Sequence, residues 1–170
     1  PRAVKACDRD GSILFCSSFS KTIAPGYRVG WVVPGRYLQE VERQKYVTSV
    51  ATPAPTQMAI AVYLADGGYD RHLRRLRETY QALQARFVAA VTEYFPEGTK
   101  MTRPRGGHIV WLELPPGLDS FALYRLARRH RISLAPGPIY SASGSYRNCI
   151  RLNYAVPWSD AIDRALRALG

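Results

Sequence analysis

The stretch "SSFSKTIAPGYRVGW", residues 17–31, decides how this chain is interpreted. It overlaps the mostly apolar run "ILFCSSF", residues 13–19, which predicts a buried strand. The alternating run "YRVGWVV", residues 27–33, predicts a second strand. Between them, Pro25-Gly26 is typical of a type II turn, with glycine at the position of positive φ. The sequence therefore places Lys21 in a loop between two strands.

The residues around Lys21 indicate a specific chemistry. A lysine amine attacks a carbonyl to form a Schiff base when its surroundings favour the neutral amine. Ser18 and Ser20 supply hydroxyl groups, and the predicted turn returns the guanidinium of Arg28 toward them. An aldehyde that carries a phosphate needs such a set, so the loop suggests pyridoxal 5'-phosphate (PLP). Taken singly, each residue fits equally well a surface lysine beside an unrelated arginine.

The composition is that of an ordinary folded chain with an excess of positive charge. The 170 residues are 46% hydrophobic and carry a formal net charge of +11. A basic surface is compatible with nucleic acid or anionic ligands without establishing either. No apolar run approaches the roughly 20 residues that span a bilayer, so we expect no membrane association and a cytoplasmic location.

The cysteines and histidines indicate neither a disulfide framework nor a metal site. The cysteines are odd in number and far apart, and we expect all three to be small buried thiols: Cys7, Cys16 and Cys149. The histidines lack the spacing of metal ligands: His72, His108 and His130. We therefore predict no metal.

The chain divides into two parts that differ in their predicted secondary structure. Periodicity and end signals predict helices over residues 37–49, 56–66, 73–95, 120–130 and 159–169. Short strands are predicted in "RAVKACD" (2–8) and, after the long helix, in "GTKMTRP", "GGHIVWLELP", "ISLAPG" and "NCIRLNYA". We expect an α/β first part and an α+β second part, with domains 1–97 and 98–170 joined by the long helix.

The spacing S-x-S-K-x-x-x-P-G-x-R-x-G-W resembles the cofactor-lysine signature of fold-type I PLP-dependent aminotransferases. The matching residues are Ser18, Ser20, Lys21, Pro25, Gly26, Arg28, Gly30 and Trp31. The resemblance implies that Lys21 carries PLP as a Schiff base and that Ser18 and Arg28 hold the phosphate. Ser20 would bind the phosphate or structure the loop. The layout of the whole chain is similar to the C-terminal portion of such an enzyme, namely part of the large domain plus the small α+β domain.

A second arginine extends the resemblance. In "CIRLNYA" the alternation places Ile150, Leu152 and Tyr154 on one face and Arg151 on the other. In similar enzymes the arginine at this place binds the α-carboxylate of the amino-acid substrate. The pair Gly106-Gly107 matches a family segment that approaches the substrate, but a plain turn explains it as well.

Two kinds of parent protein fit the resemblance. The wording "FSKTIAPGYRVGWVVPGRY", "YDRHLRRLRETY" and "GGHIVWLELP" is most similar to the MocR branch of GntR-superfamily transcription regulators. In that branch a winged-helix DNA-binding domain precedes an aminotransferase-like domain that senses PLP or an amino acid. The alternative is a genuine amino-acid aminotransferase, in which the freed amine of Lys21 would also move a proton. A third interpretation is a basic nucleic-acid or scaffold module, against which burial of Lys21 beside Arg28 would count.

The resemblance also sets expectations about partners and activity. Only twenty residues precede Lys21, whereas family members place their contacts to the cofactor ring before that lysine. We therefore expect the chain alone not to catalyse transamination. The resemblance implies a homodimer for the parent protein and DNA binding only through a domain that precedes these residues.

Overall fold

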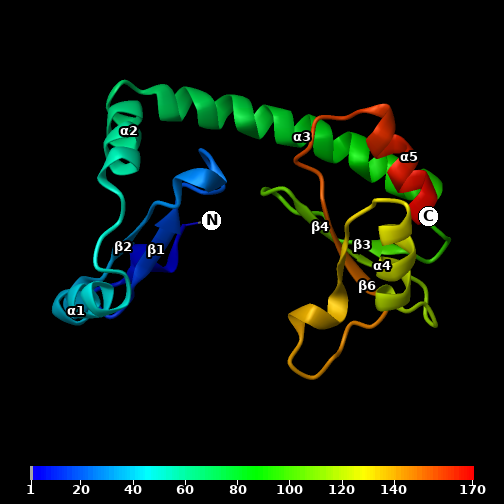
Figure 1. The fold of residues 1–170 in the computed structure, drawn as a ribbon, viewed down its shortest axis with the longest axis horizontal. Helices are drawn as coiled ribbons and strands as arrows, with labels where there is room; N and C mark the ends of the chain where they lie inside the picture. Colours follow the sequence, from blue (N-terminus) through cyan, green and yellow to red (C-terminus); the bar gives the residue numbers. More distant parts are fainter. Residues whose placement is uncertain (1) are drawn as a thin grey trace. The chain divides into compact units, whose positions relative to one another are not determined.

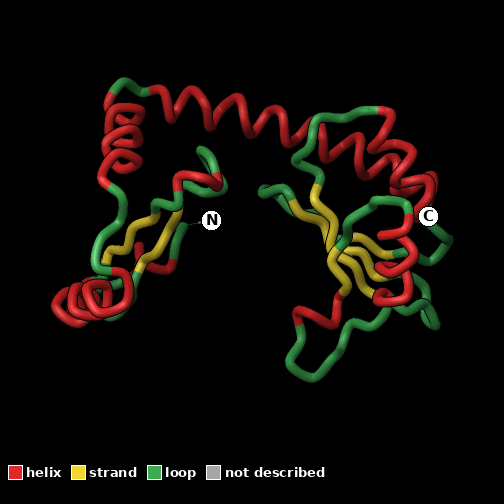
Figure 2. The backbone as a smooth tube through the Cα atoms, viewed as in Figure 1, coloured by secondary structure: helices red, strands yellow, loops and turns green. Residues whose placement is uncertain are grey.

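The computed structural model describes residues 2–170 and separates them into two compact units (Figures 1 and 2). One unit extends to Arg74 and the other runs from Arg75 to Gly170. Within residues 2–170, no helix is long and apolar enough to cross a membrane.

The first unit is built on a hairpin of two strands. Strands β1 (Phe15–Ser18) and β2 (Gly30–Val33) pair antiparallel, with Phe15 opposite Val33 and Ser18 opposite Gly30. The hairpin is followed by helices α1 (Leu38–Ser49) and α2 (Ala54–Ala65) and by the start of α3 (Gly68–Tyr94). Three short 3-10 helices complete the unit: η1 (Val4–Cys7), η2 (Pro25–Tyr27) and η3 (Gly35–Tyr37). Because β1 and β2 pair directly, residues 19–29 form a closed loop at one end of the hairpin.

The strand predicted over residues 2–8 is wrong, because Val4–Cys7 within this range form η1. The Nζ of Lys5 lies 2.6 Å from the carboxylate of Asp8 and donates a second hydrogen bond of 2.8 Å to the carbonyl of Ile13. The hydrogen bond from Lys5 holds the pKa of Asp8 at about 2, well below its usual range. The N–H of Asp8 also donates to the carbonyl of Lys5 (3.1 Å), so backbone and side chains both pair within this turn and the segment joins no sheet.

The expected burial of the first strand is also wrong. Cys16 of β1 is exposed, as is Cys7, whereas Cys149 in the other unit is buried as predicted. The reason is that β1 pairs only with β2, so within this unit the two-stranded ladder leaves much of both strands uncovered. Trp31 packs edge-on against Phe15, with 5.0 Å between ring centroids, yet remains 39% exposed.

The second unit is a four-stranded antiparallel sheet with helices on one face. The strands are β3 (Lys100–Met101), β4 (Ile109–Glu113), β5 (Ala135–Pro136) and β6 (Cys149–Asn153), in the order β3-β4-β6-β5. Helices α4 (Ser120–Arg129), α5 (Asp160–Leu169) and the second part of α3 contribute to one core with the sheet. At its centre Val110, Leu112 and Ile150 are fully buried. A short 3-10 helix, η4 (Gly137–Tyr140), follows β5.

The five predicted helices are confirmed, with ends that shift by a few residues. Asp119 caps α4 by accepting from the backbone N–H groups of Phe121 (2.8 Å) and Ala122 (3.0 Å), and these bonds lower the pKa of its carboxyl. Ser159 caps α5 in the same way. The helix α3 spans the point where the two units divide, and we keep residues 98–170 as the proposed small domain with α3 as its connector.

We expect Leu112→Ala to lower the free energy of unfolding of the second unit by about 3 kcal/mol, because it leaves a cavity in a fully packed core. Leu126→Ala on α4 is the matched control, since Leu126 is 54% exposed. Urea denaturation followed by circular dichroism measures both. Equal losses for the two variants would contradict the core described here.

Candidate functional site

The loop 19–29 closes through backbone hydrogen bonds at both ends. The N–H of Phe19 donates to the carbonyl of Val29 (3.0 Å), and the N–H of Ile23 donates to the carbonyl of Phe19 (2.8 Å). The predicted type II turn is wrong. Pro25-Gly26 lies in η2, and the left-handed position falls on Arg28 (φ 52°, ψ 34°) instead of Gly26. A 3-10 helix needs negative φ at Gly26, so the residue with positive φ lies two positions later, at Arg28.

The left-handed backbone of Arg28 directs its side chain toward the serines. The Nη1 of Arg28 donates to the Oγ of Ser20 (3.3 Å), and the N–H of Ser20 donates to the Oγ of Ser18 (3.1 Å). The Oγ of Ser18 also donates to the carbonyl of Val29 (3.4 Å). The structure therefore brings together Ser18, Ser20 and Arg28, which we call the serine–arginine cluster.

Gly30 allows this cluster to form. A Cβ at this position would lie 2.8 Å from the carbonyl oxygen of Ser17 and 3.6 Å from the Cβ of Ser18. The first distance is too short for a real contact, so only glycine lets β2 approach β1 beside Ser18.

Lys21 follows the cluster directly and is exposed. Within residues 2–170 its amine makes no hydrogen bond or ion pair. Burial of Lys21 beside Arg28 would have counted against the interpretation as a scaffold module, and this burial is not observed. Lys21 is the residue next to Ser20 of the serine–arginine cluster in the chain.

Helix α3 anchors the residues that follow Lys21, a feature that sequence reasoning missed. The hydroxyl of Tyr69 donates to the Oγ1 of Thr22 (3.1 Å), and Nε2 of His72 lies 2.9 Å from the carbonyl oxygen of Thr22. The rings of Phe19 and Tyr69 pack edge to face at 5.9 Å. Their separation of about fifty residues in the chain left no local signal of this contact.

In the second unit, Arg151 extends from β6 on the face opposite the core. Ile150, Leu152 and Tyr154 are buried and Arg151 is exposed, as the alternation predicted. The guanidinium lies over the ring of Tyr140, 4.9 Å from its centroid. Among the described residues Arg151 has no carboxylate partner within ion-pair distance. Its hydrogen-bond donors are therefore free to bind an anion.

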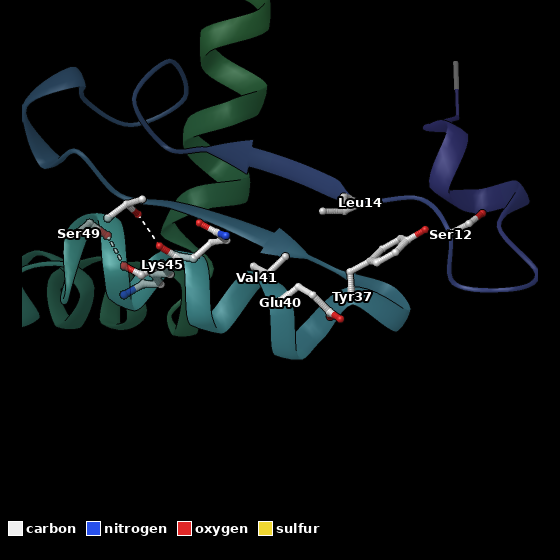
Figure 3. A pocket seen from close by; sticks show the side chains of 9 residues that line it. Ser12, Leu14, Tyr37, Glu40, Val41, Lys45 and Ser49 are labelled. Carbon is white, nitrogen blue, oxygen red and sulfur yellow. Dashed lines mark hydrogen bonds between the residues drawn. The ribbon is translucent and has the colours of Figure 1, made fainter.

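Figure 3 shows a cavity elsewhere in the first unit, with a volume of about 660 Å³. It lies between α1 and the segment that leads into β1, and Tyr37, Glu40 and Lys45 are among its lining residues. None of the predicted site residues lines it. The residues 2–170 also contain no group of three His, Cys, Asp or Glu side chains that could hold a metal ion.

The donor set of the loop fits PLP. Two hydroxyls and a guanidinium match the acceptor oxygens of a phosphate, and the exposed amine of Lys21 matches its aldehyde.

Comparisons with known proteins show the family to which the chain is related. Residues 3–169 match the family described as aminotransferase class I and II. Over 170 residues the chain is 46% identical to the uncharacterised helix-turn-helix (HTH) type transcriptional regulator YjiR of Escherichia coli strain K12, covering 100% of this chain and 36% of that protein.

Two solved structures share the fold. One is the kynurenine aminotransferase of Pyrococcus horikoshii, which was solved with PMP. Its TM-score is 0.89 at 30% identity, and the match covers 98% of this chain and 41% of that chain. LysN, the alpha-aminoadipate aminotransferase of Thermus thermophilus, was solved with N-(5'-phosphopyridoxyl)-L-leucine. Its TM-score is 0.85 at 32% identity, and the match covers 92% of this chain and 40% of the LysN chain. The chain thus spans between 36% and 41% of the length of these three proteins.

We expect Gly30→Ala to lower the free energy of unfolding of the first unit by about 1–2 kcal/mol, because the added methyl group meets the backbone of the paired strand. Gly26→Ala is the control, since a Cβ there meets nothing within 4 Å. Urea denaturation measures both variants. A loss as large for Gly26→Ala would show that the close approach of the strands is not the cause.

Proposed function

Because the chain belongs to the aminotransferase class I and II family, we propose that it is the PLP-binding part of an effector-sensing domain in an HTH-type transcription regulator. The observation that carries the proposal is the serine–arginine cluster, which the exposed Lys21 directly follows in the chain. The identity of 46% over the whole chain to an HTH-type regulator supports the regulator over other members of the family.

Each residue of the loop has a role in this proposal. Lys21 binds the aldehyde carbon covalently, with its amine nitrogen as the nucleophile. Ser18 and Ser20 donate hydroxyl hydrogens to the phosphate, and Arg28 offsets its charge. When bound, PLP supplies an aldehyde that exchanges between amines and a ring that withdraws electrons. The chain's own part is to hold the phosphate so that the aldehyde stays within reach of Lys21.

Arg151 recognises the second ligand in this proposal, an amino acid or related amine. A planar guanidinium binds a carboxylate through two parallel hydrogen bonds, and Tyr140 supports the guanidinium from one side. In this proposal Arg151 binds the α-carboxylate of the effector, and the amino group of the effector competes with Lys21 for the aldehyde of PLP.

A genuine aminotransferase is the second candidate. The likeness to the kynurenine aminotransferase, at a TM-score of 0.89, favours it. In that case Lys21, once its amine is free, would also move a proton to and from the substrate carbon. For either parent we propose a homodimer in the cytoplasm, and for the regulator we propose that DNA is bound only by a separate domain.

We expect incubation with PLP followed by borohydride reduction to add one cofactor, confined to Lys21. Intact mass spectrometry with peptide mapping measures it, and Lys21→Ala is expected to abolish the adduct. Lys5, Lys45 and Lys100 are internal controls in the same chain. Labelling spread over these lysines would contradict a role for the loop.

We expect Arg151→Ala to weaken amino-acid binding about 30-fold, because the ligand carboxylate loses a charged bidentate partner. The PLP adduct on Lys21 should be retained, since Arg151 is not among its contacts. Isothermal titration calorimetry of the PLP-loaded protein with an α-amino acid measures the affinity. An unchanged affinity would remove Arg151 from the site.

A further inference from the structure

Three aromatic rings gather beside Arg151 on the face of the sheet opposite the core. Trp111 is the direct cross-strand partner of Arg151. Its ring packs edge to face against Tyr140, with centroids 5.8 Å apart, and against Tyr146, with centroids 5.5 Å apart. We call Trp111, Tyr140 and Tyr146 the aromatic shelf. Tyr140 is 43% exposed and Tyr146 is 54% exposed, so apolar ring surface is open beside a cation.

Tyr146 occupies a backbone position that disfavours it. Its φ is +64°, in the left-handed region that a bulky side chain rarely adopts. The backbone is held there by packing: its carbonyl accepts from the N–H of Cys149 (2.9 Å) and lies so close to Gly137 that no Cβ would fit there. Glycine or asparagine would satisfy this position at lower cost.

The fold therefore explains the conformation at position 146 but not the tyrosine. What the tyrosine adds is a ring that packs against Trp111 in a residue that is 54% exposed. Strained residues that expose a recognition group are concentrated at functional sites. An exposed ring at a strained backbone position is therefore a candidate for contact with a ligand.

The guanidinium of Arg151 defines which ligand the shelf accepts. Tyr140 covers one face of the guanidinium, at 4.9 Å, which leaves the N–H groups at its edge for an anion. Because Tyr140 lies against the guanidinium and Trp111 is opposite Arg151 on the next strand, aromatic rings adjoin the residue that would bind the carboxylate. Rings in offset or edge-to-face contact with an aromatic ligand add affinity beyond the burial of area.

We propose that the aromatic shelf selects carboxylate ligands that carry an aromatic group, so that the effector or substrate is an aromatic α-amino acid. The assignment of an α-amino group rests on the proposed function at Lys21. The preference for an aromatic carboxylate rests only on the shelf and Arg151, and it can be tested without PLP.

The test compares 3-phenylpropanoate with propanoate, two acids that lack the amine and cannot react with PLP. Isothermal titration calorimetry on the full chain measures both dissociation constants. We expect 3-phenylpropanoate to bind at least about tenfold more tightly, the contribution of a well-packed ring pair. Tyr146→Gly should remove most of this preference while leaving the affinity for propanoate within about twofold.

Two further variants keep the result interpretable. Tyr146→Asn also removes the ring and tolerates positive φ. Arg131→Gly is the backbone control, because Arg131 has φ +59° in the same unit, so this change relieves strain without removing a ring. Equal affinity for the two acids, or a preference that survives both Tyr146 variants, would overturn the proposal. Failure of the PLP adduct at Lys21 would leave this preference intact and would count only against the proposed function.

Discussion

The pairing of Ser18 with Gly30 across the first hairpin is the constraint on which the candidate cofactor site depends. It closes residues 19–29 into a loop whose two ends lie side by side, so that Arg28, near the end of the loop, meets the serines at its start. A side chain at Gly30 would force the strands apart, and the left-handed turn at Arg28 would then direct its guanidinium elsewhere. The geometry of a strand pair thus assembles the donors for a phosphate beside Lys21.

Side chains along the strands of the small sheet point alternately to its two faces, and this alternation separates the residues that stabilise the sheet from those available for recognition. Residues of β4 and β6 that face the helices, such as Leu112 and Ile150, are fully buried. Their neighbours Trp111 and Arg151 face the other way and are paired across the strands. A packed core on one face therefore holds a cation and an aromatic surface in a fixed register on the other, which is what selective binding of a small anion needs.

Much of this could be predicted from local patterns in the sequence. Helical periodicity predicted the five helices, and alternation predicted that Arg151 lies outside the core. Residues 2–8 were mispredicted because Lys5 pairs with Asp8 and with the carbonyl of Ile13, contacts that the strand pattern of the segment does not reveal. The left-handed turn at Arg28 and the hydrogen bond from Tyr69 to Thr22 depend on tertiary contacts, which a local sequence pattern does not reveal. The shelf was missed for the same reason, since Tyr146 gives no local signal of its strained backbone.

The central claim, that the loop is a phosphate cradle for PLP, is tested most directly by ³¹P NMR of the PLP-loaded protein between pH 5 and 8. A free phosphate monoester titrates in this range, with a second pKa of about 6. Held by two serines and Arg28, the bound phosphate should give one resonance whose chemical shift stays constant with pH, and Arg28→Ala should restore the titration. A bound resonance that titrates in the unaltered protein as the free cofactor does would contradict the account.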